Sequence, residues 1–225
     1  MKFKCPVVSR GVHLRGLCVG CEGAPSGQME LGRGEILFRQ GDPAQRVFAV
    51  TEGWLRVFVT TADGQACAAR LVGPGHVLGL EAFGHGSPHY QATVDALRPA
   101  KLCAVPALLV KSWFRQHPDE AMALTAMTVE DLGELQRRLV QNASLSAEDR
   151  VFELIKDLTG HVAQGTWVQL PATREQLGEV LGLTFETVSR MIHRLVDRGV
   201  LEVDGRRVKM LSTSLETDAH AARPR

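Results

Sequence analysis

The segment from residue 173 to residue 201 constrains the fold most, because it predicts two short helices joined by a tight turn. Thr173 followed three residues later by Gln176 forms a capping box, so a helix should begin at Arg174. Gly182 is the expected end of this helix. Its apolar residues recur at helical spacing and predict a buried stripe of Leu177, Val180 and Leu181.

A second helix is predicted to begin after the N-cap Thr184 and to end near Arg198, before Gly199. One face is apolar and should meet the core, through Val188, Met191, Ile192 and Leu195. The other face carries Phe185, Glu186, Ser189, Arg190, His193 and Arg194. Arginine can donate two bonds to guanine, glutamate can accept one from the cytosine amino group, and serine can do either. The polar face therefore predicts readout of base edges in the major groove of DNA.

A hairpin is predicted directly after these helices, from residues 200–203, an Asp204-Gly205 turn and residues 207–210. Helix pair and hairpin together predict a winged helix-turn-helix. From Thr184 to Met210 there are six Arg or Lys residues against four Asp or Glu, inside a chain of net charge +1. The competing interpretation is a solvated helix face on another small helical domain.

The run from Gly182 to Arg190, GLTFETVSR, resembles the recognition motif of the CRP/FNR transcription regulators. Glu186, Ser189 and Arg190 give the Glu-x-x-Ser-Arg arrangement that is similar to the FNR branch. The resemblance covers residues 31 to 210 and implies TTGAT-type half-sites in an inverted repeat. It also implies RNA polymerase as a partner. We predict double-stranded DNA contacts from Thr184, Glu186, Thr187, Ser189, Arg190 and Arg194.

Short apolar strands separated by turn-forming glycines are predicted from residue 31 to residue 115, which favours a β-barrel or roll. The expected strands are residues 35–38, 46–50, 55–59, 66–72, 92–94 and 101–105. The glycine rhythm resembles the antiparallel, cupin-like β-roll of cyclic-nucleotide-binding domains. The predicted fold class is α+β. Its parts are a cysteine-containing segment 1–30, the roll 31–115, a dimerisation helix 116–145, the DNA-binding domain 146–211 and a disordered tail 212–225.

That resemblance raises a cyclic nucleotide as ligand, but the sequence argues against it. Such pockets hold the phosphate with an arginine, and the corresponding stretch here, residues 89–92, has none.

A long helix is predicted after Pro118, since the stretch to Ala143 contains a single glycine, Gly133, and no further proline. An inverted-repeat site requires a two-fold partner, which favours a homodimer over an ordinary core-facing helix. The predicted dimer seam is Thr128, Leu132, Leu135 and Leu139. Ser146 should cap a further helix over residues 147–159.

Five cysteines are the best indication of a signal. Cys18 and Cys21 are spaced so that both sulfurs can reach one metal, and Cys5 lies in the same segment. Residues 101–106 resemble the FNR segment whose cysteine, here Cys103, is the fourth ligand of an oxygen-sensitive 4Fe-4S cluster. The resemblance implies Cys5, Cys18 and Cys21 as the other ligands. Cys67 is expected to be a buried inert thiol.

Other interpretations of these residues stay open. Cys18 and Cys21 suit a Zn site or a dithiol-disulfide switch, and the thiols can be inert. Haem is a further option, because some relatives bind it in the roll and three histidines lie near that region: His76, His85 and His89. Another effector in the roll is the remaining alternative.

The 225 residues and 44% hydrophobic content suit two modest domains. No apolar run approaches the roughly 20 residues of a membrane helix, and residues 1–5 lack a secretory signal, so we expect a cytoplasmic protein without a membrane partner. The sequence contains no recognisable catalytic motif, so we expect that the protein is not an enzyme. The rival from another class is a cysteine-metal redox or storage protein without specific DNA binding.

Overall fold

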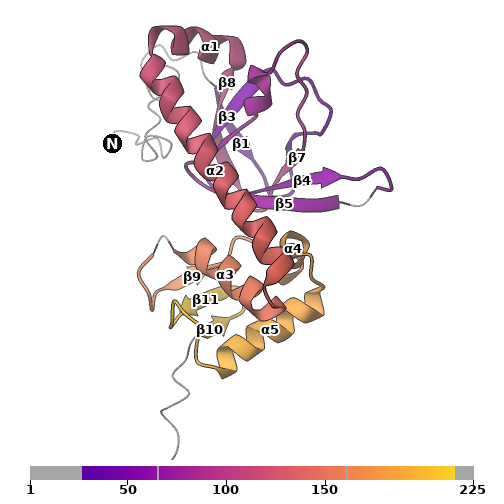
Figure 1. Cartoon of the computed structure of the whole chain (residues 1–225), viewed down its shortest axis with the longest axis vertical. Helices are drawn as coiled ribbons and strands as arrows, with labels where there is room; N and C mark the ends of the chain where they lie inside the picture. Colours follow the sequence, from indigo (N-terminus) through magenta and orange to yellow (C-terminus); the bar gives the residue numbers. More distant parts are fainter. Residues whose placement is uncertain (1–26, 65, 161, 216–225) are drawn as a thin grey trace, which may run out of the picture. The chain divides into compact units, whose positions relative to one another are not determined.

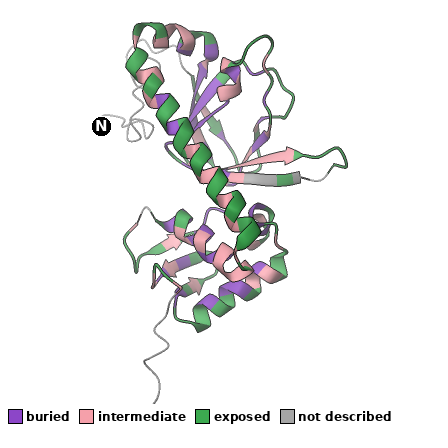
Figure 2. Cartoon of the chain, in the orientation of Figure 1, coloured by how far each residue is buried: buried purple, intermediate pink, exposed green. Residues whose placement is uncertain are grey.

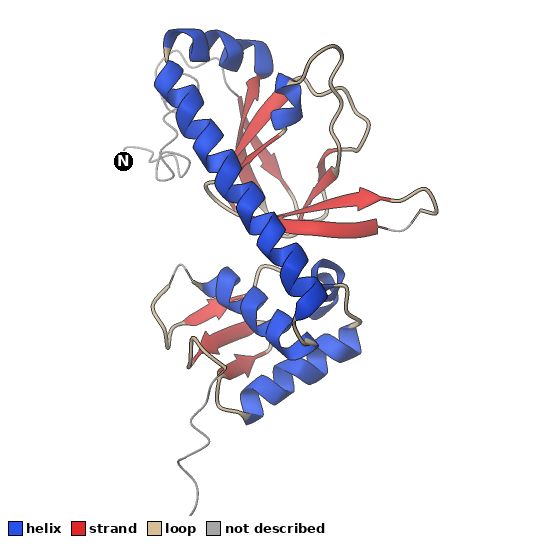
Figure 3. Ribbon diagram, viewed as in Figure 1, coloured by secondary structure: helices blue, strands red, loops and turns tan. Residues whose placement is uncertain are grey.

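The computed structural model describes residues 27–64, 66–160 and 162–215, and the chain divides into two compact units, Met1–Leu135 and Gln136–Arg225 (Figure 1). Two four-stranded antiparallel sheets dominate the described part of the first unit. Short helices and a three-stranded sheet make up the described part of the second (Figure 3). The predicted fold class, an antiparallel β-roll followed by a winged helix-turn-helix, is confirmed.

The two sheets of the first unit form the β-roll. One sheet has the order β1-β8-β3-β6, built from Gly27–Leu31, Ala100–Pro106, Arg46–Glu52 and Val77–Leu78. The other has the order β2-β7-β4-β5, built from Ile36–Phe38, Thr93–Ala96, Leu55–Thr60 and Ala66–Val72. A short 3-10 helix, η2 (Leu80–Phe83), follows β6.

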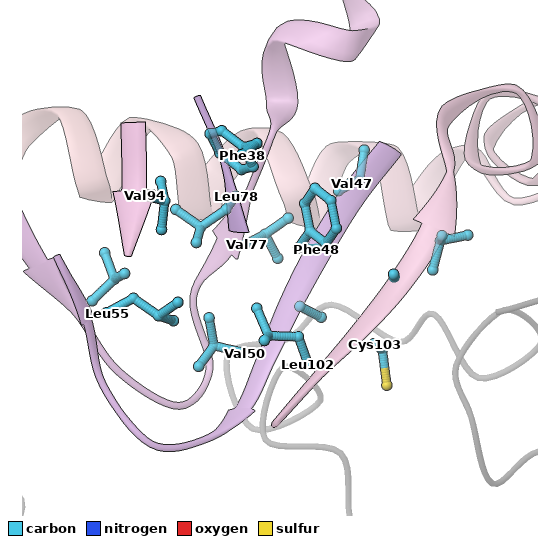
Figure 4. Packing of buried hydrophobic residues seen from close by; sticks show 14 of the residues in the cluster. Phe38, Val47, Phe48, Val50, Leu55, Val77, Leu78, Val94, Leu102 and Cys103 are labelled. Carbon is cyan, nitrogen blue, oxygen red and sulfur yellow. The ribbon is translucent and has the colours of Figure 1, made fainter. Parts of the chain in front are cut away.

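The core of the roll lies between the sheets, because alternate residues of each strand point inward. Val50 and Leu102 from one sheet and Leu55 from the other are completely buried. Figure 4 shows these side chains turned toward one another. Tyr90 adds an aromatic group: its ring stacks on Phe38 at 3.9 Å, and its hydroxyl donates to the Arg46 carbonyl at 2.9 Å. Burial of this kind raises the pKa of Tyr90.

Three details of the roll differ from the expectation. β1 begins at Gly27 and pairs with β8, although the first of the expected strands begins only at residue 35. Its sequence hides this, because Leu31 is the only buried residue of the strand and no apolar alternation results. β6 is two residues long, too short to produce a period. Cys67 is exposed and not buried, since it lies toward the tip of the β4–β5 hairpin, opposite Val59.

Two helices follow the roll. α1 (Ala107–Gln116) was not expected, and it begins directly after β8. α2 (Pro118–Ser144) extends over the range predicted for a long helix, and the boundary between the two units falls within it, after Leu135. Leu124 and Met127 of α2 belong to the roll core. No helix in the described residues is both long and apolar enough to span a membrane.

The second unit contains α3 (Ala147–Thr159), α4 (Arg174–Leu181) and α5 (Phe185–Asp197), with the strands β9 (Trp167–Gln169), β10 (Leu201–Asp204) and β11 (Arg207–Met210). The sheet order is β10-β11-β9, and the short edge strand β9 was not predicted. The turn of the predicted hairpin is shifted by one residue. Asp204 pairs with Arg207, so Gly205 and Arg206 form the loop, with positive φ at Gly205.

Candidate nucleic-acid interface

The turn between α4 and α5 is set by two glycines. Gly182 takes the left-handed conformation, φ +64°, which ends α4 without the strain that a side chain would meet. Gly178 lies one turn earlier, and a Cβ there would stand 2.4 Å from the carbonyl oxygen of Leu183. The chain can therefore fold back directly over α4, and α5 follows at once.

Both helices begin at the predicted caps. Thr173 Oγ1 accepts from the Gln176 amide at 3.3 Å, and Gln176 Oε1 accepts from the Thr173 amide at 2.9 Å, which completes the capping box. Thr184 Oγ1 accepts from the Thr187 amide at 3.3 Å and donates to the Thr187 hydroxyl at 3.2 Å. The predicted DNA contacts Thr184 and Thr187 are thus also the residues that start α5.

The faces of α5 separate as the sequence predicted. Its apolar face is buried against α3 and α4, through Val188, Met191, Ile192 and Leu195. On the other face Glu186, Arg190, His193 and Arg194 are exposed, and Ser189 is half-buried. Figure 2 shows both buried and exposed positions along α5. Within the described residues no hydrogen bond or ion pair holds the Arg190 guanidinium. Four charged or ring side chains and one hydroxyl are thereby gathered along one exposed helix face.

Glu186 is in the first turn of α5, where backbone amides point outward. Its own amide, and then the Thr184 hydroxyl, hold the pKa of this carboxyl below its usual range. The side chain is exposed and ionised at neutral pH, so it can accept hydrogen bonds and cannot donate them. That state suits the amino group of cytosine.

Arg194, another predicted contact, shares a carboxylate with Arg198. Glu148 of α3 lies 2.6 Å from Arg198 Nη1 and 4.0 Å from Arg194 Nη1. The Arg194 side chain is 59% exposed and is held loosely, so it stays available to a phosphate.

One residue that contacts this face of α5, Arg174 of α4, was not predicted from the sequence. Its Nη1 donates to Ser189 Oγ at 2.6 Å, which joins the first residue of α4 to the middle of α5. Only the fold brings these positions together, because they lie fifteen residues apart. The single available signal was the position of an arginine at the start of the first helix.

The outer face of the wing carries cations that are already partly neutralised. Lys209 Nζ lies 3.1 Å from Glu202 Oε2, and Arg207 Nη1 lies 3.7 Å from Asp204 Oδ2. Both cations also stand over the ring of Trp167, at 5.8 and 5.2 Å from its centroid. The wing therefore offers a weaker positive field than its lysine and arginine count suggests.

The α2 helix exposes an apolar stripe. Met122, Val129, Leu132 and Leu139 are exposed at successive spacings of seven, three and seven residues, and the exposed Val140 directly follows Leu139. Of the predicted seam, Leu132 and Leu139 belong to this stripe, while Leu135 is half-buried. Thr128 is exposed, and its hydroxyl donates back to the Leu124 carbonyl at 2.8 Å. The exposed apolar stripe thus shares Leu132 and Leu139 with the predicted seam and adds Met122, Val129 and Val140.

Of the predicted cluster ligands, Cys5, Cys18 and Cys21 lie outside the described residues. Cys103 is 2% exposed on β8, and Figure 4 shows its sulfur turned away from the labelled core side chains. Gln28 of β1 stands directly opposite Cys103. No group of three or more His, Cys, Asp or Glu within the described ranges is placed to hold a metal ion.

The three histidines considered as haem ligands lie within the described residues. His85 and His89 are exposed, and Nδ1 of the half-buried His76 lies 3.0 Å from the Gly73 carbonyl oxygen.

Two family models match the chain. One describes the cyclic nucleotide-binding domain and covers residues 28–117, and the other describes the Crp-like helix-turn-helix domain and covers residues 149–214. Transcriptional activator protein FnrA of Stutzerimonas stutzeri is 29% identical over 187 residues, which are 81% of this chain and 76% of that protein. Transcriptional activator protein anr of Pseudomonas aeruginosa shows the same identity and coverage. The structure of FixK2 from Bradyrhizobium japonicum superposes with a TM-score of 0.76 at 25% identity, covering 84% of this chain and 93% of that one.

Proposed function

Because the chain belongs to the CRP/FNR family of DNA-binding transcription regulators, we propose that it binds TTGAT-type inverted repeats as a homodimer under control of a cysteine-ligated 4Fe-4S cluster. The observation that carries this proposal is the exposed face of α5, whose opposite face is buried. The relatives are transcription regulators and not enzymes. They give no support to the rival, a storage or redox protein without specific DNA binding.

Base readout is assigned to three residues of α5. Arg190 has no competing bond in the described chain and can direct two donors at a guanine. The ionised Glu186 accepts from a cytosine amino group, and Ser189 contacts a neighbouring base. Contacts to the sugar-phosphate backbone are assigned to Thr184, Thr187 and Arg194.

Dimerisation is assigned to the exposed apolar stripe of α2. Five apolar side chains on one helix stripe are costly in water and are covered when two such helices pack together. A two-fold dimer also places two copies of α5 on the two halves of an inverted repeat. We take Met122, Val129, Leu132, Leu139 and Val140 as the interface, in place of Thr128 and Leu135.

The sensor is assigned to Cys5, Cys18, Cys21 and Cys103. Thiolate is the donor that iron-sulfur clusters require, and Cys103 of β8 is shielded from solvent. β1 begins six residues after Cys21 and runs opposite Cys103, so six extended residues, about 20 Å, limit the reach of the segment. A bound cluster would supply a centre that oxygen destroys. Zn or a Cys18–Cys21 disulfide is the alternative use of the same thiols.

Other partners follow from the same assignment. RNA polymerase is the protein partner that we propose for a transcription regulator of this family. A cyclic nucleotide is not expected, because residues 89–92 hold no arginine and Tyr90 of that stretch packs into the core.

The decisive experiment combines metal analysis with DNA binding. Protein purified without oxygen is examined by absorbance and by iron, sulfide and zinc content, then again after exposure to air. A brown protein that bleaches in air supports the cluster, and a colourless protein with zinc or no metal contradicts it. Salt-dependent binding to a TTGAT inverted repeat, compared with a scrambled duplex, tests the DNA assignment separately.

A further inference from the structure

We propose that Arg174 is a positioning residue for base readout, which fixes the Ser189 hydroxyl as a hydrogen-bond donor toward DNA. Position 189 would then select a base that presents an acceptor. The inference rests on the proposed function, since it requires α5 to lie in the major groove. A serine alone does not make this selection, because its hydroxyl can donate or accept.

The contact between the two side chains has one possible polarity. Arg174 Nη1 lies 2.6 Å from Ser189 Oγ, and a guanidinium has donors and no acceptor. Ser189 Oγ is therefore the acceptor in this bond, and its proton must point elsewhere. Both residues are half-buried, so the bond is partly shielded from water.

Other hydroxyls within helices of this protein use their protons differently. Thr125, Thr128, Ser144 and Thr159 each donate to the carbonyl four residues earlier, at 2.8 Å. Among the described hydrogen bonds, Ser189 Oγ takes part in the bond from Arg174 and in no backbone bond of this kind. The Ser189 proton is consequently uncommitted and can be directed outward from α5.

A neighbouring cation also changes the strength of the hydroxyl. A charge-assisted bond to the oxygen polarises the O–H group, which becomes a better donor and a poorer acceptor. The base groups that match are thymine O4, guanine O6 or N7, and adenine N7. The amino groups of cytosine and adenine do not match.

The fold holds Arg174 where this role needs it. The capping box of Thr173 and Gln176 fixes the start of α4, and Arg174 is its first residue. Arg174 lines a small hollow together with Ile192 of α5 and with Gly205 and Arg206 of the wing turn. Residues of α5 and of the wing turn therefore lie close to the start of α4.

The test uses the full-length protein and a double-mutant cycle. Wild type is first given a random duplex library to define its preferred site, and binding is then measured to duplexes that carry each of the four base pairs at each position. The variants are Ser189→Ala, Arg174→Met and the two combined. We expect both single variants to lose about three- to tenfold discrimination at the same base pair, and the combined variant to lose no more.

Two controls separate positioning from other roles of an arginine. Arg207→Met removes an equal charge from the wing and should leave discrimination at that base pair unchanged. Arg174→Lys keeps the charge but not the guanidinium geometry, and it should restore affinity more than discrimination. Salt series report the number of phosphate contacts in each variant. Circular dichroism and thermal unfolding of each variant report its fold.

The outcomes are distinct. If Ser189→Ala relaxes one base pair while Arg174→Met and Arg174→Lys weaken all duplexes equally, Arg174 is a phosphate contact and the inference is wrong. Additive losses in the combined variant also overturn it. Wild-type protein that binds all duplexes alike contradicts the proposed function itself.

Discussion

The carboxylate of Glu148 lies 2.6 Å from a guanidinium nitrogen of Arg198, which bonds the start of α3 to the end of α5. The same carboxylate stands 4.0 Å from Arg194, a residue of the proposed DNA-binding face. One acidic side chain thereby lowers the positive charge that this end of α5 presents to DNA. Glu148 therefore both holds α5 against α3 and reduces the positive charge near Arg194.

Replacing Glu148 by Gln should therefore strengthen DNA binding. Arg194 would lose a neighbouring negative charge, and we expect affinity to rise about two- to fivefold at low salt, with a smaller gain at high salt. The free energy of unfolding should fall by at most about 1 kcal/mol, because the ion pair with Arg198 is partly exposed. Fluorescence anisotropy over a salt series and chemical denaturation measure the two effects.

A matched control is available in the same helix. Glu153 pairs with Lys156 of α3 at 2.6 Å and forms no hydrogen bond or ion pair with α5 among the described residues, so Glu153→Gln removes the same charge elsewhere. An equal rise in affinity from both variants would show that net charge, and not the position of Glu148, governs binding.

Arg190→Ala should weaken the free energy of operator binding by about 1–3 kcal/mol and should reduce discrimination between bases at a single base pair. The described structure gives this guanidinium no internal bond to replace, so the fold should be unchanged. Competition binding with operator variants measures the discrimination. Equal weakening at every base pair would identify Arg190 as a phosphate contact.

The depressed pKa of Glu186 predicts readout that is insensitive to mild acid. Because the folded-state pKa lies below the usual range, the carboxylate stays ionised as the pH falls, and its stabilisation is lost only as the pH passes through that lowered value. The preference of wild type over Glu186→Gln for the cognate duplex should thus be the same at about pH 8 and about pH 5.5. Comparing the variants at each pH removes effects of other titrating groups.

The Thr184 hydroxyl is one cause of this depression, so Thr184→Ala should raise the pKa of Glu186 and destabilise α5 by about 1 kcal/mol through the lost N-cap. Thr184→Ser keeps the hydroxyl and should do neither. NMR titration of the Glu186 carboxyl carbon distinguishes them. An unchanged pKa in Thr184→Ala would assign the depression to the backbone amide alone.

Cys103→Ala should remove any iron-sulfur absorbance and the response to air, while the β-roll remains folded. The sulfur is buried, so the lost contacts are those of one small side chain. Cys67→Ala is the matched control, because Cys67 is exposed on β5 and should leave metal content unchanged. A normal iron content in Cys103→Ala would exclude it as a ligand.

The helix-turn-helix could be predicted almost residue by residue, because its information is local. The capping box of α4, the N-cap of α5, the glycine turn and the apolar stripe of α5 each lie within a few residues of the element that they specify. β1, β6 and β9 could not be predicted in this way. They are short, and their pairing with β8, β3 and β11 is what makes them strands.

The candidate site shows the same division. Glu186, Ser189 and Arg190 follow from a helical period, whereas the bond from Arg174 to Ser189 exists only once two helices meet. Likewise, period alone gave the predicted α2 seam of Thr128, Leu132, Leu135 and Leu139. Leu132 and Leu139 belong to the exposed apolar stripe, whereas the packing of Leu124 and Met127 in the roll core, which also leaves Met122, Val129 and Val140 exposed, has no local signal.

The exposed stripe of α2 supplies the last test. Leu132 and Leu139 are 53% and 70% exposed, and we expect Leu132→Glu and Leu139→Glu each to weaken the dimer at least about tenfold, since both would bury a charge in an apolar seam. The monomer should keep its fold, because neither residue belongs to the described core. Sedimentation over a concentration series gives the dimer affinity. Binding to an inverted repeat should fall to the level of a single half-site.

Leu108 of α1 is the control, as it is 79% exposed and lies outside α2. Leu108→Glu adds the same charge to an exposed leucine and should leave the dimer intact. If all three variants sediment as wild type, the two-fold contact is made by another surface. If Leu108→Glu alone dissociates the dimer, the interface lies on α1. The pattern across the three variants therefore identifies which helix joins the two copies of α5 into one reader of an inverted repeat.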